Sequence, residues 1–106
     1  MNVKEFARIW RAEKDLLLKM YSASSEETAV SKMIQELQLN NNGIEKMKQV
    51  LDCVLTDTFY TFLMGLDGAA SIGGVQQDYK VYDENDTLIF ESGDLEAEAY
   101  EQFHEL

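Results

Sequence analysis

The stretch from Ile44 to Leu66 constrains the fold of this chain more than any other. Its apolar side chains recur at intervals of three and four residues, which is the period of one face of an α-helix. These side chains are Ile44, Met47, Leu51, Val54, Leu55, Phe59, Phe62, Leu63 and Leu66, with Val50, Cys53, Tyr60 and Met64 widening the face. A helix that is apolar nearly all round is a buried one. We therefore expect residues 44–66 to form a buried central helix on which the other elements pack.

Two helices are predicted before this central helix. An apolar stripe through Val3–Tyr21 indicates an amphipathic helix that carries most of the positive charge of the chain. A second helix is expected to begin after Ser24, which has Glu27 three residues later in the spacing of a capping box, and to run to about Leu39. The segment Asn40-Asn41-Asn42-Gly43 then ends that helix and caps the next one.

A β-hairpin and a last helix are predicted after the central helix. Apolar and polar residues alternate from Val75 to Tyr82, which is typical of a half-buried strand, and Thr87–Glu91 returns as a second strand. The turn Asp83–Asp86 is too short for a parallel crossover, so the pair is antiparallel. Asp94 begins a helix that runs to the end of the chain, with acidic residues in its first turns. The fold predicted is α+β: three N-terminal helices, a hairpin and a C-terminal helix.

The length and composition favour one globular domain, residues 1–106. The chain is 45% hydrophobic and 27% charged, which are ordinary values for a globular protein. A single cysteine allows no internal disulfide and suits a reducing compartment. No apolar run follows the first residues, and the apolar stretch Phe59–Leu66 is less than half of the roughly 20 residues needed to cross a bilayer. We expect a cytoplasmic protein.

Charge is divided unequally along the chain. Residues 1–50 carry eight basic and seven acidic residues, a net of +1, whereas residues 51–106 carry one lysine and thirteen acids, a net of −12. This distribution argues against binding to nucleic acid or to an anionic membrane, because both would repel the acidic half. It favours a basic protein partner, and it is also compatible with an acidic surface that serves only solubility.

The residues offer little for catalysis, cofactors or metals. His104 lies close to the end of the last predicted helix, where the helix dipole would favour its positive charge, and Cys53 lies on the apolar central helix. The glycine-rich segment 65–74 follows a helix and lacks the Gly-Lys-Ser/Thr of a phosphate-binding loop. Asp83–Asp86 lacks the glycine and the distal glutamate of a calcium loop. We expect no enzyme activity, no cofactor and no metal.

A surface for a partner is predicted on the hairpin and its flanking loops. Acidic side chains and one tyrosine gather there and would form a negative end on a neutral helical body. The candidate partner-binding residues are Asp67, Asp78, Tyr82, Asp83, Glu84, Asp86 and Glu91.

Four features occur together in the second half of the chain: Thr56–Tyr60, Leu66–Ala70, the hairpin with Tyr79, and Gly93–Glu96. In these features the chain resembles small acidic bacterial proteins of uncharacterised families, some of which are similar to the immunity proteins of polymorphic toxin systems. The resemblance to the immunity proteins has the more specific consequence. It implies an inhibitor that binds a basic cognate toxin and has no chemistry of its own.

Two other hypotheses remain open. A small-molecule or enzymatic site could use the glycine-rich loop and the end of the central helix, with Asp57, Tyr60 and Asp67 lining a pocket. Alternatively, the hairpin could pair with its copy across a two-fold axis and form a homodimer.

Overall fold

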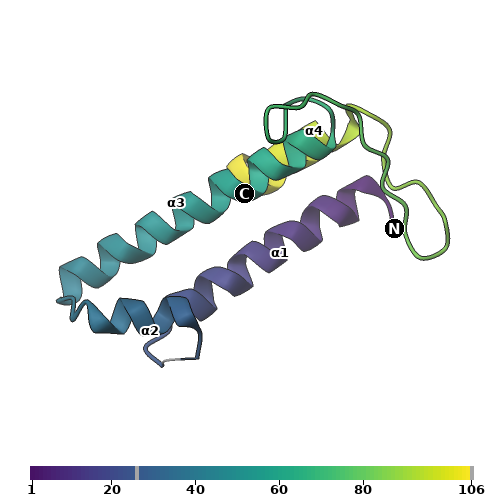
Figure 1. Cartoon of the computed structure of the whole chain (residues 1–106). Helices are drawn as coiled ribbons and strands as arrows, with labels where there is room; N and C mark the ends of the chain where they lie inside the picture. The colour runs from purple at the N-terminus through teal and green to yellow at the C-terminus, as the bar shows by residue number, and fades with distance from the viewer. Residues whose placement is uncertain (26, 106) are drawn as a thin grey trace.

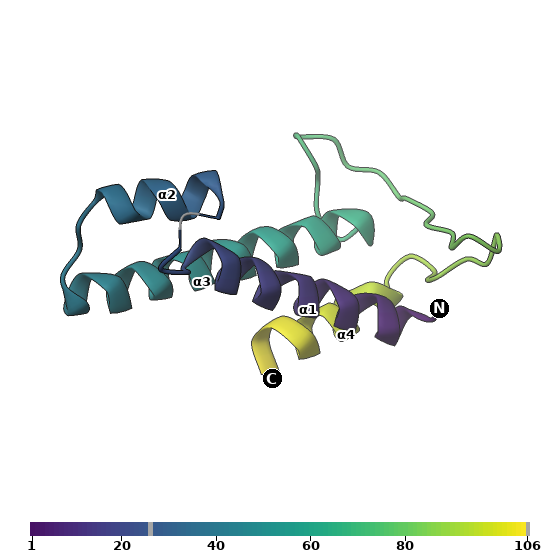
Figure 2. The same cartoon turned by 90° about the horizontal axis from the view of Figure 1, so that it is seen from below.

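The computed structural model describes residues 1–25 and 27–105, and over this range the chain is helical with one long connecting loop (Figure 1). The elements are α1 (Val3–Tyr21), α2 (Ala29–Glu36), α3 (Asn41–Leu66), α4 (Asp94–Tyr100) and a π-helical segment (Glu101–Glu105) that continues α4. Helices α1 and α3 run antiparallel, and α4 lies along the C-terminal half of α3 (Figures 1 and 2). The molecule is elongated, with principal extents of 46 × 29 × 25 Å. None of the helices in the described residues combines the length and the apolarity that crossing a bilayer requires.

The first three helices begin where short polar side chains satisfy their free N–H groups. The helix predicted at residues 3–21 is confirmed, and its Asn2 side chain accepts from the N–H of Glu5. The predicted Ser24–Glu27 capping box is wrong, because Thr28 and Ser31 form the box instead, with reciprocal bonds of 2.9 and 3.0 Å. Helix α2 consequently starts late, and it ends at Glu36, before the predicted Leu39.

Helix α3 is longer than the pattern of apolar residues indicated. The Asn40 side chain accepts from the N–H of Gly43 at 2.8 Å, so Asn40 caps the helix and the next three residues are already helical. Within the predicted capping segment Asn40–Gly43, Asn40 is thus the residue that caps α3. Apolar periodicity could not reveal these first residues because none of them contributes to the apolar face.

The predicted α+β fold is wrong, because none of the described residues forms a β-strand. The chain does reverse at Asp83–Asp86, and Tyr82 and Leu88 form one antiparallel bridge. A second isolated bridge joins Ile72 and Val75 around Gly73 and Gly74, whose φ angles of +59° and +82° match a tight two-residue turn. Two short strands without a third are marginal in water, so the predicted ladder does not extend beyond single bridges.

Only the last turns of α3 are buried, which corrects the prediction of a buried central helix. Leu63, Met64 and Gly65 are buried, whereas Val50 and Val54 are 53% and 54% exposed. Cys53, expected to be a buried apolar residue, is also exposed. The reason is length: a helix of 26 residues extends about 39 Å, and the shorter α4 covers only one end of it.

The core therefore lies at one end of the molecule. It brings together the first turns of α1, the last turns of α3, the helix α4 with its π-helical continuation, and the end of the connecting loop. Its buried apolar members are Phe6, Ala7, Leu63, Met64, Ile89, Phe90, Leu95, Ala99 and Phe103. Trp10 packs beside this core, with its ring centroid 5.6 Å from that of Phe59.

This arrangement predicts very different costs for two substitutions on the same helix. Leu63→Ala should lower the free energy of unfolding by about 2–5 kcal/mol, because it leaves a cavity in the core. Val54→Ala should change it by less than about 0.5 kcal/mol, because the side chain is exposed. Urea unfolding followed by circular dichroism measures both. Equal losses would mean that the core extends along the whole of α3.

Candidate binding surface

Asp67, predicted to be a surface residue, is buried and serves as the cap of α4. Its side chain is only 2% exposed. Its carboxylate accepts from the N–H groups of Gly93 at 2.8 Å, Leu95 at 3.2 Å and Glu96 at 3.0 Å. The residue in the N-cap position is Gly93, which has no side chain to offer. Asp67 therefore joins the end of α3 to the start of α4 and is not available to a partner.

Asp78 lies in a second contact that fixes the loop. The Ser92 hydroxyl is 3.2 Å from the Asp78 carboxylate and 3.1 Å from the backbone carbonyl of Asp67. Asp78 also lies directly against Gly68, where a Cβ atom would overlap the carboxylate and where φ is +80°. Glycine is required at position 68 on both grounds.

Asp83 organises the turn at the tip of the loop. Its carboxylate accepts from the N–H groups of Asn85 at 2.8 Å and Thr87 at 3.1 Å. The hydrogen bonds from Thr87 and Asn85 hold the pKa of Asp83 below its ordinary value. This side chain is occupied within its own turn, as in many Asp-initiated turns.

Like Asp78, the other four predicted residues are exposed on the loop. Tyr82 is 54% exposed, and Glu84, Asp86 and Glu91 are exposed as well. The structure thus divides the seven predicted residues into two groups. Asp67, Asp78 and Asp83 accept hydrogen bonds that hold the loop in place. The other four are exposed side chains of the loop. We call Tyr82, Glu84, Asp86 and Glu91 the acidic loop face.

The pocket expected from Asp57, Tyr60 and Asp67 does not form. Asp57 borders a hollow of about 420 Å³ beside Ile72, whereas Tyr60 borders a different hollow of about 380 Å³ beside α4. Asp67 is buried under the start of α4. Asp57 and Tyr60 therefore border different hollows, one beside Ile72 and one beside α4, and Asp67 is covered by the start of α4.

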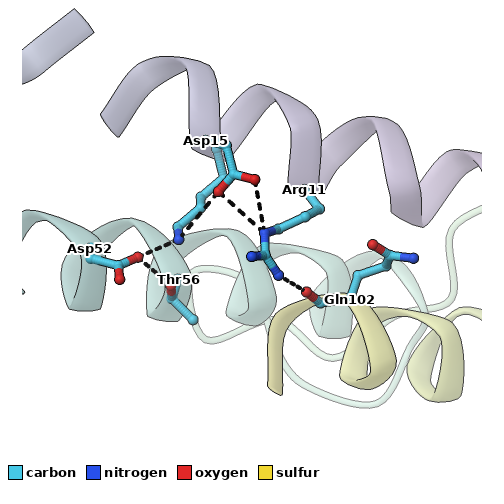
Figure 3. Close-up of polar contacts among 6 residues, drawn as sticks. Arg11, Asp15, Asp52, Thr56 and Gln102 are labelled. Atoms are coloured by element: carbon cyan, nitrogen blue, oxygen red, sulfur yellow. Dashed lines mark hydrogen bonds and ion pairs between the residues drawn. The ribbon is translucent and has the colours of Figure 1, made fainter. Parts of the chain in front are cut away.

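A row of charged side chains that was not predicted from the sequence joins α1 to α3 and to the last helical segment (Figure 3). We call it the charged seam. Lys14 is buried and pairs with Asp52 of α3, and it lies 3.6 Å from Asp15. Arg11 contacts Asp15 at 3.1 Å and donates to the backbone carbonyl of Gln102. The signal was present, because Lys14 falls on the apolar stripe of α1, four residues after Trp10 and three before Leu17.

An apolar groove of about 600 Å³ opens between α2 and the first turns of α3, at the end away from the core. Met33 and Leu37 of α2 are 66% and 64% exposed, and Val50 of α3 also faces this groove. Val50 was predicted to be buried on the central helix. These three side chains are exposed because α4 does not reach this end of α3.

Comparison with family models, with curated proteins and with solved structures finds no match for this chain.

The role of Asp67 predicts a large loss of stability from a single substitution. Asp67→Ala should lower the free energy of unfolding by about 2–3 kcal/mol, because three N–H groups lose a charged acceptor. Glu84→Ala is the control, since it also removes one acid from the loop but leaves these bonds intact. Chemical denaturation of both variants measures the difference. Similar, small losses would show that the α4 cap is not needed.

The Lys14–Asp52 pair predicts a defined pH dependence. The hydrogen bond from Lys14, the largest cause, holds the pKa of Asp52 below its ordinary value of 3.8. A folded-state pKa that is lowered stabilises the protein above the unfolded-state pKa, and this contribution is lost as pH falls through the folded-state value. Asp52→Asn should therefore cost about 1 kcal/mol at pH 7, a modest value because Asp52 is half exposed.

The difference between wild type and Asp52→Asn should shrink progressively as the pH is lowered below about 4, where the wild-type carboxylate becomes neutral in the unfolded chain. Thermal melts across this range measure it. A difference that stays constant with pH would contradict the ion pair.

Proposed function

We propose that this protein is a protein-binding module that docks on a basic surface of another protein through its acidic loop face, and that it acts in the cytoplasm as an immunity-type inhibitor. The observation that carries the proposal is that the predicted residues of the loop have two different roles. Asp67 and Asp83 accept hydrogen bonds from backbone N–H groups, and Asp78 accepts from the hydroxyl of Ser92. The four residues of the acidic loop face are left exposed on the loop.

A loop held in this way is suited to binding. Ordering a flexible segment on association costs free energy, and a segment that is already fixed by internal hydrogen bonds avoids most of that cost. A solvated surface that served only solubility would need acidic side chains but no fixed backbone beneath them. The internal anchors therefore favour recognition over solubility alone.

The charge of the chain supports a basic partner. The net charge of −12 over residues 51–106 includes the loop and α4, which lie together at the core end of the molecule (Figure 1). A field of one sign raises the rate of encounter with a surface of the opposite sign. Tyr82, exposed within this field, is of the residue type that most often anchors an interface.

The apolar groove between α2 and α3 also favours a binding protein over an enzyme. Contiguous exposed apolar surface is typical of proteins that associate with others. The residues predicted to line an enzymatic pocket lie apart: Asp57, Tyr60 and Asp67. The inhibitor role and its toxin partner rest on the resemblance to immunity-type proteins, and the cytoplasmic location rests on the single cysteine.

The proposal is tested by capture and by charge reversal. The tagged full chain is used to capture proteins from lysate of its native cell at low and at high salt, and the captured basic protein is then purified. Reversing Glu84 and Glu91 to lysine should slow association with that protein by about tenfold at low ionic strength and flatten its salt dependence.

A matched control separates the loop from total charge. Glu5→Lys with Glu13→Lys makes the same change in net charge on exposed positions of α1. This control should leave association nearly unchanged. If it slows association as much as the loop variant does, the effect is one of net charge and the acidic loop face is not the contact.

A further inference from the structure

The hollow beside Tyr60 is lined by aromatic rings and carboxylates and is separate from the acidic loop face. It has a volume of about 380 Å³ and lies between α3, α4 and the π-helical segment. Its lining residues are Tyr60, Gly93, Glu96, Ala97, Tyr100 and Glu105. Tyr60 is half-buried, while Tyr100 is 48% exposed at the rim.

The two tyrosine rings form a corner. Their centroids are 6.4 Å apart and their planes are inclined at 68°. The ring of His104 packs against both, with centroids 4.5 Å from Tyr60 and 5.3 Å from Tyr100. These contacts hold the rings in place, so the corner exists before any ligand arrives. The face of a tyrosine ring carries negative charge density and attracts cations.

The charged residues that line this pocket are acidic, so their negative charge adds to the negative charge density of the ring faces. Glu96 and Glu105 contribute carboxylates, and the six lining residues include no lysine or arginine. Burial, followed by the negative charge of Glu96 and then by Tyr100, raises the pKa of Tyr60 above its ordinary value. The N–H groups at the start of α4, which would repel a cation, already donate to the carboxylate of Asp67.

We propose that this pocket binds the cationic end of an arginine or lysine side chain, with Tyr60 and Tyr100 in cation–π contact and Glu96 as the ion-pair partner. The inference deepens the proposed function, because it rests on that function for the source of the side chain, an exposed basic residue of the partner protein. A guanidinium group suits the site well, since it is planar, stacks on aromatic rings and binds carboxylates through two N–H groups. An ammonium group would use the same rings and carboxylate as a point charge.

The test uses a small cation and requires no partner protein. The ¹⁵N-labelled full chain is titrated with N-acetyl-arginine amide, with N-acetyl-lysine amide, and with N-acetyl-citrulline amide, which has nearly the shape of the arginine probe without its charge. We expect saturable shifts at Tyr60, Glu96, Ala97 and Tyr100 with the cationic probes and no saturable shifts with the citrulline probe. The stronger of the two cationic probes identifies the preferred side chain.

Variants assign the binding to the named side chains. Tyr100→Leu and Glu96→Gln should each weaken the arginine probe by about three- to fivefold, the effect of one cation–π contact or one exposed ion pair. Glu45→Gln, at the opposite end of α3, removes the same charge from an exposed position and should bind like wild type. Unchanged two-dimensional spectra outside the pocket would show that each variant is folded.

Three outcomes would overturn the inference: no saturable binding, equal binding of the citrulline probe, or shifts centred on the acidic loop face. Failure here is distinct from failure of the proposed function. If the probe does not bind but partner association still depends on Glu84 and Glu91, only the pocket is wrong. If the probe binds and the loop variants leave association unchanged, the pocket stands and the acidic loop face is not the contact.

Discussion

The buried carboxylate of Asp67 is the interaction on which the core end of this molecule depends. Helix α4 has only seven residues before its π-helical continuation, and an isolated helix of that length is not stable in water. Asp67 supplies the cap that Gly93 cannot, and it does so from the end of α3, 26 residues earlier in the sequence. One side chain thus closes the connecting loop and positions α4 over the hydrophobic core. Because α4 carries Glu96 and Tyr100, Asp67 also sets the position of the pocket beside it.

The two ends of the elongated molecule differ because α4 covers only one of them. At the core end, α1, α3 and α4 bury a common set of apolar side chains around Leu63 and Leu95. Midway, the packing gives way to the charged seam, in which Lys14 is buried and paired with Asp52. A buried lysine is tolerated only with such partners. Beyond the seam, apolar residues such as Met33 and Val50 remain exposed along the groove.

The acidic loop face could be predicted in part. The local excess of acids after residue 66 identified the correct segment, and the turn at Asp83–Asp86 follows directly from its turn-forming residues. Composition could not separate Glu84 from Asp67, because an acid that caps a distant helix and an acid that faces solvent look alike in a sequence. Only the path of the chain brings Gly93 to Asp67 and Ser92 to Asp78. The pocket of Tyr60 and Tyr100 likewise needs two helices to be placed side by side.

The sequence by itself determined the helices and the uneven distribution of charge. Helix α1 begins and ends where its apolar stripe predicts, and α3 was recognisable from its spacing of apolar residues. These are local properties, set by interactions within a few residues. Tertiary structure decided whether the alternating segment after Val75 became a strand and which face of α3 was buried. Both depend on a neighbour: a strand needs an extended partner, and an apolar face is buried only where another element reaches it. The segment after Asp86 pairs with the alternating segment at the single bridge of Tyr82 and Leu88, and α4 is too short to cover the first part of α3.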